Sequence, residues 1–159
     1  YTREAARLLK ELHCPFVVNQ RRYSIFDRTI EEDGVKKCCQ EEGLGIIAFS
    51  PLAQGMLTDK YIHGLPKDSR LARDARFIQT SDVTDERITH IKQPNELADQ
   101  RGQTLAQMAL SWVLKDEDVC SVLIGASKPE QIIENLSVAG HAWFSAEELD
   151  LIAAISGRQ

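Results

Sequence analysis

The sequence has no apolar run that approaches the about 20 residues needed to cross a membrane, and no secretory signal peptide opens it. We therefore expect a protein without a membrane span, located in the cytoplasm. Negative charge exceeds positive charge: 19 Lys and Arg stand against 24 Asp and Glu, a formal net charge of −5. Because nucleic-acid binding relies on a basic surface, this balance argues against a nucleic-acid partner.

The sequence also lacks cysteines at the spacing of a familiar metal site. The four cysteines form no C-x-x-C pair, and the four histidines are scattered through different segments. We expect reduced thiols, no disulfide between the adjacent Cys38 and Cys39, and no metal. With 43% hydrophobic and 27% charged residues, the 159-residue chain has a globular composition, and we expect a single domain over residues 1–159.

The most informative stretch is SVLIGASKPEQIIEN, residues 121–135. It opens with a short apolar run that predicts a buried parallel strand, and the pattern becomes helical after Gly125. Ser127 and Glu130 have the spacing of a capping box, with Pro129 in the first turn. Unpaired N–H groups and the helix dipole make such a helix start suitable for a phosphate, although most capping boxes only cap their helix.

Helices and buried strands alternate along the chain. Short buried strands are expected at 16–18, 44–49 and 121–124. Strands separated by helices form right-handed βαβ units, so the expected fold class is α/β with a parallel sheet. Such proteins place their sites at the carboxyl ends of the strands. Helical patterns cover 2–12, 30–42, 82–101, 104–114, 129–136 and 145–155, and Pro94 is expected to kink or restart the third of them.

Two of the expected strands are followed by candidate site residues. Asn19 and Gln20 follow the first strand, and the segment 50–55 follows the second. The two amides either bind a ligand or satisfy backbone groups at the strand end. The loop up to residue 76 then contains Lys60, Arg70 and three further basic residues, which form either a solvated face or an anion-binding surface.

Several collinear motifs, which together span nearly the whole chain, resemble the C-terminal half of an aldo-keto reductase. Within that family they look most like the branch that holds a bacterial L-glyceraldehyde 3-phosphate reductase and the potassium-channel β-subunits. The resemblance implies the C-terminal half of a (β/α)8 TIM barrel that uses NADP(H) to reduce a small aldehyde or ketone without a metal. The motifs are Val18-Asn19-Gln20, IAFSPLAQG at 47–55, Lys60-Tyr61, Ser69-Arg70, Ala109-Leu110-Ser111-Trp112, and VLIGAS at 122–127 with Gln131 and Glu134-Asn135.

The resemblance also implies roles in NADP(H) binding for individual residues. Gln20 would bind the nicotinamide carboxamide, and Phe49 would stack on the nicotinamide ring. The loop after the second strand would line the pyrophosphate, and two basic residues would close over the phosphates. The last strand-to-helix turn would meet the 2′-phosphate and the adenosine. These three groups are, in order, Ser50, Pro51, Leu52, Gln54 and Gly55; Lys60 and Arg70; and Gly125, Ser127, Gln131, Glu134 and Asn135.

The chain departs from the family pattern in one respect. The catalytic Asp, Tyr, Lys and His of the family lie in its N-terminal half, and none of those motifs is present, so we expect no catalytic residue in this chain. A complete barrel needs about 250 residues and eight strands, so we expect a fragment of a longer protein. Two other functions stay open: a non-catalytic accessory subunit that binds NADP(H) and a protein partner, and a phosphosugar-binding barrel of another family. A homo-oligomer is left open too.

Overall fold

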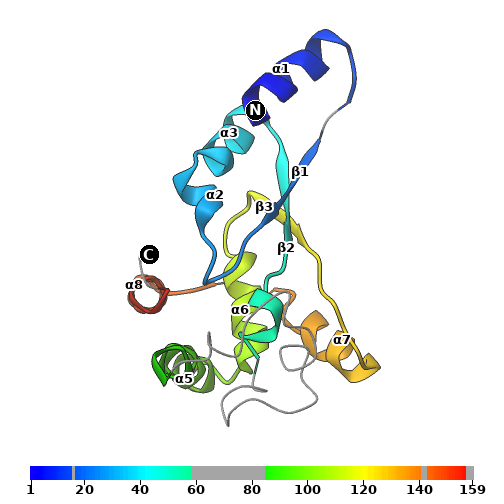
Figure 1. Ribbon diagram of the computed structural model, residues 1–159. Coiled ribbons are helices and arrows are strands. Elements are labelled where there is room, and N and C mark those ends of the chain that lie inside the picture. The colour runs from blue at the N-terminus through cyan, green and yellow to red at the C-terminus, as the bar shows by residue number, and fades with distance from the viewer. Residues whose placement is uncertain (16, 59–84, 141–142, 157–159) are drawn as a thin grey trace.

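Figure 1 shows the computed structural model, a three-stranded sheet with helices packed against it. The structure describes residues 1–15, 17–58, 85–140 and 143–156; Phe16 and residues 82–84, expected in a strand and a helix, lie outside these ranges. β1 (Val18–Arg22), β2 (Gly45–Phe49) and β3 (Val119–Val122) form one parallel sheet in the order β1-β2-β3, which confirms the α/β fold class. The helices are α1 (Thr2–Glu11), α2 (Thr29–Glu32), α3 (Val35–Glu42), the short 3-10 helix η1 (Ala53–Gly55), α5 (Asp85–Gln100), α6 (Leu105–Val113), α7 (Pro129–Leu136) and α8 (Ala146–Ile155).

Two strands have other bounds than the sequence suggested. Asn19 and Gln20 lie inside β1 instead of following it, Val17 is 69% exposed, and no residue of β1 is buried. β3 ends at Val122, so Leu123 and Ile124, which were expected in a buried strand, are 47% and 37% exposed. The exposure has the same reason in both places: within the described sheet β1 and β3 are edge strands, with a neighbour on one side only. The bounds of β1 follow its register with β2, from Val18 to Arg22.

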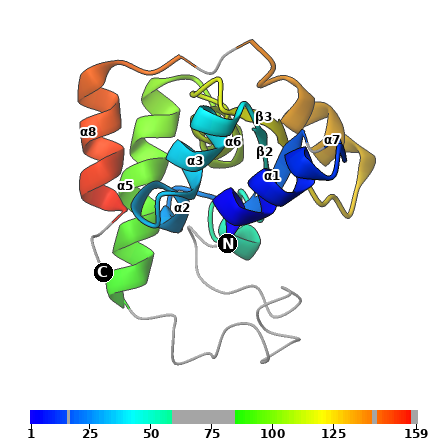
Figure 2. The ribbon, with the colours of Figure 1, turned by 90° about the horizontal axis from the view of Figure 1, so that it is seen from above.

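The helices follow the expected pattern with two corrections. Gly34 divides the expected helix 30–42 into α2 and α3, because its φ of 77° is left-handed. α5 continues through Pro94 as one helix, so the expected restart does not occur. α8 begins at the expected capping box, in which Ser145 Oγ accepts a hydrogen bond from the Glu148 N–H at 3.2 Å. In Figure 2, α5 and α8 lie side by side.

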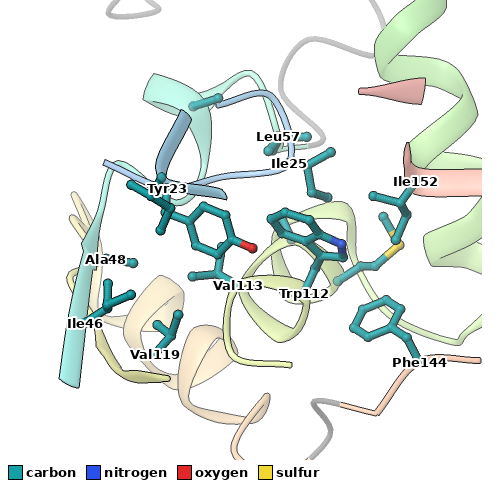
Figure 3. Close-up of a cluster of buried hydrophobic side chains, with 14 of the residues drawn as sticks. Tyr23, Ile25, Ile46, Ala48, Leu57, Trp112, Val113, Val119, Phe144 and Ile152 are labelled. Atoms are coloured by element: carbon teal, nitrogen blue, oxygen red, sulfur yellow. The ribbon is translucent and has the colours of Figure 1, made fainter. Parts of the chain in front are cut away.

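One face of the sheet carries the hydrophobic core, which Figure 3 shows. Along β2 the burial alternates, so that Ile46 and Ala48 are fully buried on the face that packs against helices. Trp112 of α6 is 1% exposed and packs on Tyr23, with the ring centroids 5.1 Å apart. Met108 is buried as well, which confirms the expected core role of Met108 and Trp112.

The opposite face of the sheet is more accessible, and we call it the open face. Successive side chains of a strand point to opposite faces, so the residues between the buried ones share this face. None of its members is buried. They are Val18, Gln20 and Arg22 of β1, Gly45, Ile47 and Phe49 of β2, and Ser121 of β3.

The cysteines and the helices bear on three expectations. All four cysteines are free thiols in the structure, Cys38 and Cys39 buried and Cys14 and Cys120 exposed. Within the described ranges, no three His, Cys, Asp or Glu side chains gather in a way that suits a metal ion. The helices in those ranges are all too short or too polar to cross a membrane.

Candidate functional site

Two predicted site residues, Gln20 and Phe49, lie near each other on the open face. Gln20 pairs in register with Ile47, and Phe49 pairs with Arg22, so the amide and the aromatic ring are diagonal neighbours. Gln20 is exposed and Phe49 is half-buried. Phe49 ends β2, and the carboxyl ends of parallel strands form the edge at which α/β proteins bind ligands. The structure therefore brings an amide and a ring together on an accessible surface.

The loop after β2 has a strained backbone. Ser50, Ala53 and Gln54 have φ values of 55°, 46° and 60°, and Gly55 has a φ of 98°. Left-handed backbone costs a residue with a side chain about 1–2 kcal/mol, and such strain is concentrated at binding sites. Sequence motifs predicted a site in this loop, but no pattern in the sequence indicated the left-handed backbone of its three non-glycine residues.

Hydrogen bonds and burial hold this loop in place. The Ala53 N–H donates to the Ser50 carbonyl at 3.0 Å, and the Gly55 N–H donates to the Leu52 carbonyl at 2.8 Å. Pro51 is buried and Leu52 is half-buried. The predicted residues of this loop thus form one fixed turn that continues directly from Phe49.

The turn before α7 differs from the expected capping box. Gln131 Oε1 accepts hydrogen bonds from the Ser127 N–H at 2.8 Å, the Ser127 hydroxyl at 3.2 Å and the Lys128 N–H at 3.3 Å. Because Pro129 occupies the first helical position, Lys128 is the N-cap and the expected pairing of Ser127 with Glu130 is wrong. Three donors therefore converge on one oxygen atom, and these are the kinds of group that hold an anion at a helix start.

Two predicted residues of α7 are engaged elsewhere. The Thr104 hydroxyl donates to Glu134 Oε1 at 2.9 Å, and Gln107 Nε2 donates to the Glu134 carbonyl at 3.4 Å. Asn135 is only 7% exposed. Glu134 thus ties α7 to the start of α6.

Of the other predicted site residues, the structure describes two that follow β3 and does not describe the two basic ones. Gly125 and Ser127 are exposed, after the end of β3. The Leu123 N–H donates to the Ala48 carbonyl at 2.8 Å, so the chain leaves β3 at the same edge of the sheet at which it leaves β2. Lys60 and Arg70 lie outside the described residues.

A buried network supports this edge of the sheet from behind. Tyr23 directly follows β1, and its N–H donates to the Phe49 carbonyl at 3.3 Å. The Tyr23 side chain is 0% exposed; its hydroxyl donates to Glu31 and accepts a hydrogen bond from Lys115 Nζ at 3.0 Å. Lys115 Nζ also lies 4.1 Å from the centre of the Trp112 ring, a cation–π contact.

The protonation states of this network are set by burial and by its ion pairs. Burial, reinforced by Glu31, raises the pKa of Tyr23 far above its usual range. Burial also lowers the pKa of Lys115, although Asp116 opposes this. Burial alone would raise the pKa of Glu31, but hydrogen bonds from Tyr23 and Arg28 hold it below its usual value. Tyr23 thus stays protonated and out of contact with solvent, which suits a structural role.

Two features of the site were not predicted from the sequence. The contact between Tyr23 and Lys115 joins residues 92 positions apart, and no local pattern indicates it. Arg22 lies on the open face beside Phe49, its partner in β2. Side chains two residues apart on a strand share a face, so the position of Gln20 could have predicted that of Arg22.

Comparisons with known proteins agree with this fold. The profile of the Aldo/keto reductase family matches residues 1–156. An L-glyceraldehyde 3-phosphate reductase of Escherichia coli O157:H7 is 44% identical over 151 residues, which cover 93% of this chain and 44% of that protein. A putative voltage-gated potassium channel subunit beta of Schizosaccharomyces pombe is 37% identical over 123 residues, which cover 76% of this chain and 36% of that protein.

The solved structure of a glycerol dehydrogenase, AKR11B4 from Gluconobacter oxydans, superposes with a TM-score of 0.72 at 25% identity. The match covers 97% of this chain and 54% of that structure. The chain thus aligns with about half of a (β/α)8-barrel enzyme, and it spans less than half the length of the curated relatives it matches. With a family match over almost every residue, and a parallel sheet of the expected kind, this chain belongs to the Aldo/keto reductase family.

Proposed function

We propose that the protein carrying this chain reduces small aldehydes or ketones with NADP(H) in the cytoplasm, and that the chain is the C-terminal, cofactor-binding half of its barrel. One observation carries the proposal: Gln20 and Phe49 share the open face, at the edge from which the strained loop continues. Membership of the family supplies the reaction class.

The residues present fit such a cofactor. The Gln20 carboxamide can both donate and accept hydrogen bonds, as can the carboxamide of nicotinamide. The half-buried Phe49 ring offers a face on which an aromatic ring can stack. The donors of Ser127 and Lys128, which now hold the oxygen of Gln131, are of the kind that would hold a 2′-phosphate. When bound, NADPH supplies the hydride that reduces the carbonyl carbon.

The other predicted residues have supporting roles in this proposal. The loop would line the pyrophosphate, the two basic residues would close over the phosphates, and Glu134 would exchange its bond with Thr104 for one to the adenosine. We assign the proton donor of the reaction to another part of the intact protein. The supporting residues are Ser50, Pro51, Leu52, Gln54 and Gly55 for the pyrophosphate, Lys60 and Arg70 for closure, Gly125, Ser127 and Gln131 for the 2′-phosphate, and Glu134 and Asn135 for the adenosine.

Two neighbouring substitutions test the site. Gln20→Ala removes a hydrogen-bonding side chain from the open face, whereas Asn19→Ala changes the adjacent residue, which faces the other way. We expect Gln20→Ala to weaken NADPH binding by about tenfold, the equivalent of one hydrogen bond. Asn19→Ala should bind NADPH as the unsubstituted protein does. Fluorescence titration of the intact proteins measures both, and equal affinities for the two variants would contradict the proposed role of Gln20.

The similarity to a potassium channel subunit beta favours a second candidate, an accessory subunit that binds NADP(H) and a protein partner. Turnover distinguishes the two functions. Oxidation of NADPH by the intact protein in the presence of a small aldehyde supports the reductase. Tight NADPH binding without turnover of any aldehyde supports the accessory role.

A further inference from the structure

We propose that Arg22 selects carbonyl substrates that carry a negative charge, in the form of a phosphate or a carboxylate group. The inference rests on the proposed function, because that function places the reacting carbonyl close to Phe49. Arg22 would be a specificity-determining residue of the same site.

The register of the sheet puts Arg22 beside Phe49. Arg22 is the last residue of β1, Phe49 is the last residue of β2, and their Cα atoms are partners in the parallel pair. Neighbouring strands lie about 4.8 Å apart. Both side chains are on the open face, so the guanidinium is within reach of a molecule that lies against the Phe49 ring.

Ion pairs distinguish Arg22 from the arginine next to it. Arg21 Nη2 lies 2.8 Å from Asp33 Oδ2, in the turn between α2 and α3, on the side of the sheet that packs against helices. Arg22 pairs through Nε with Asp27 Oδ2 at 3.2 Å, and its side chain stays 50% exposed. The two guanidinium groups therefore lie on opposite faces of the sheet, and the group of Arg22 lies on the open face with the candidate site.

The chemistry of Arg22 suits an anion. A guanidinium has five N–H donors in a planar fork, and the pair with Asp27 engages the Nε edge. Arginine binds carboxylate and phosphate groups through two parallel hydrogen bonds. The chain as a whole has a net charge of −5, which repels anions, so a local cation is needed to attract a charged substrate to this edge.

Steady-state kinetics of the intact protein with NADPH test this role. The substrates are glyceraldehyde 3-phosphate, succinic semialdehyde and neutral glyceraldehyde, and the variants are Arg22→Gln and the charge-matched control Arg21→Gln. We expect Arg22→Gln to lower kcat/KM for the anionic aldehydes by about ten- to a hundredfold, the range of a lost charged hydrogen bond. The kcat/KM for glyceraldehyde should stay unchanged, and Arg21→Gln should change none of the three values.

Each outcome decides the question. A loss confined to the phosphate substrate supports a phosphate site, and a loss for both anions supports a general anion site. An equal loss for all three substrates, or weaker NADPH binding by Arg22→Gln, would assign Arg22 to the fold or the cofactor and overturn the inference. Failure of the proposed function has a different signature: the unsubstituted protein would neither bind NADPH nor reduce glyceraldehyde, and the inference would be lost with it.

Discussion

Replacing Tyr23 with Phe removes a single oxygen atom from the buried network behind the site. The lost hydroxyl donates to Glu31 and accepts from Lys115 Nζ at 3.0 Å, with no exposure to solvent. A hydrogen bond to a charged partner contributes about 1.5–3 kcal/mol. Glu31 keeps a bond from Arg28, and Lys115 keeps one to Asp116, so neither charge is left alone. We therefore expect a loss of about 2–3 kcal/mol in the free energy of unfolding, less than the sum of two such bonds.

Urea unfolding of the intact protein measures this loss. The midpoint should fall while the slope m stays constant, because the substitution leaves the exposed surface unchanged. Lys115→Met and the double variant complete a double-mutant cycle, for which we expect a coupling energy of about 1–2 kcal/mol between residues in direct contact. A loss below about 0.5 kcal/mol for Tyr23→Phe, which is usual for a surface substitution, together with zero coupling, would refute the network.

Three further changes test other parts of the structure. Gln131→Ala should lower the free energy of unfolding by about 1 kcal/mol, since it removes the side chain that caps α7. Glu130→Ala should lower it by less than half as much. A larger loss for Glu130→Ala than for Gln131→Ala would indicate that Ser127 and Glu130 form the capping box instead. Ala53→Gly should raise the free energy of unfolding by about 0.5–1 kcal/mol, because glycine adopts the φ of 46° without strain; an unchanged or lower melting temperature would contradict this. The pKa of Glu31 lies below its usual value of 4.5, so its contribution to stability is present above that pH and is lost as the pH falls through the folded-state pKa. Urea midpoints from pH 7 to 3 should therefore fall at the acid end and fall less in Glu31→Gln; an identical acid loss in both proteins would be evidence against this ion pair.

Features encoded by neighbouring residues could be predicted from the sequence. The capping box of Ser145 and Glu148 and the apolar stripe with Met108 and Trp112 depend on residues three or four positions apart, and each lies where it was expected. The alternation of strands and helices was also sufficient to predict the parallel sheet. Such short-range patterns carry their own geometry, because the period of a helix or a strand is independent of the rest of the fold.

Boundaries set by tertiary pairing were less predictable. The sequence of β1, VNQRR, has a single apolar residue, and it forms a strand because it pairs with β2 from Val18 to Arg22. Gly34 breaks the helix through a positive φ, which the residue type permits but does not require. With Pro129 at the first helical position, the N-cap of α7 is Lys128 and not Ser127, and the side chain that accepts the capping hydrogen bonds is Gln131 and not Glu130.

The site shows the same division. Gln20 and Phe49 could be selected from motifs, and the register of the strands then brings them to one face. The strain of Ser50, Ala53 and Gln54 depends on how the loop packs after β2, so it required the structure. The network of Tyr23 required it too, because its partners come from separate helices and loops.

The most direct test of the account is an equilibrium fluorescence titration of the intact protein with NADPH and with NADH. We expect both dinucleotides to bind, with NADPH bound at least about tenfold more tightly, a difference of about 1.4 kcal/mol from contacts to one phosphate group. Equal affinities would contradict the assignment of Ser127 and Gln131 to the 2′-phosphate. Absence of binding by either dinucleotide would contradict the proposed cofactor site as a whole.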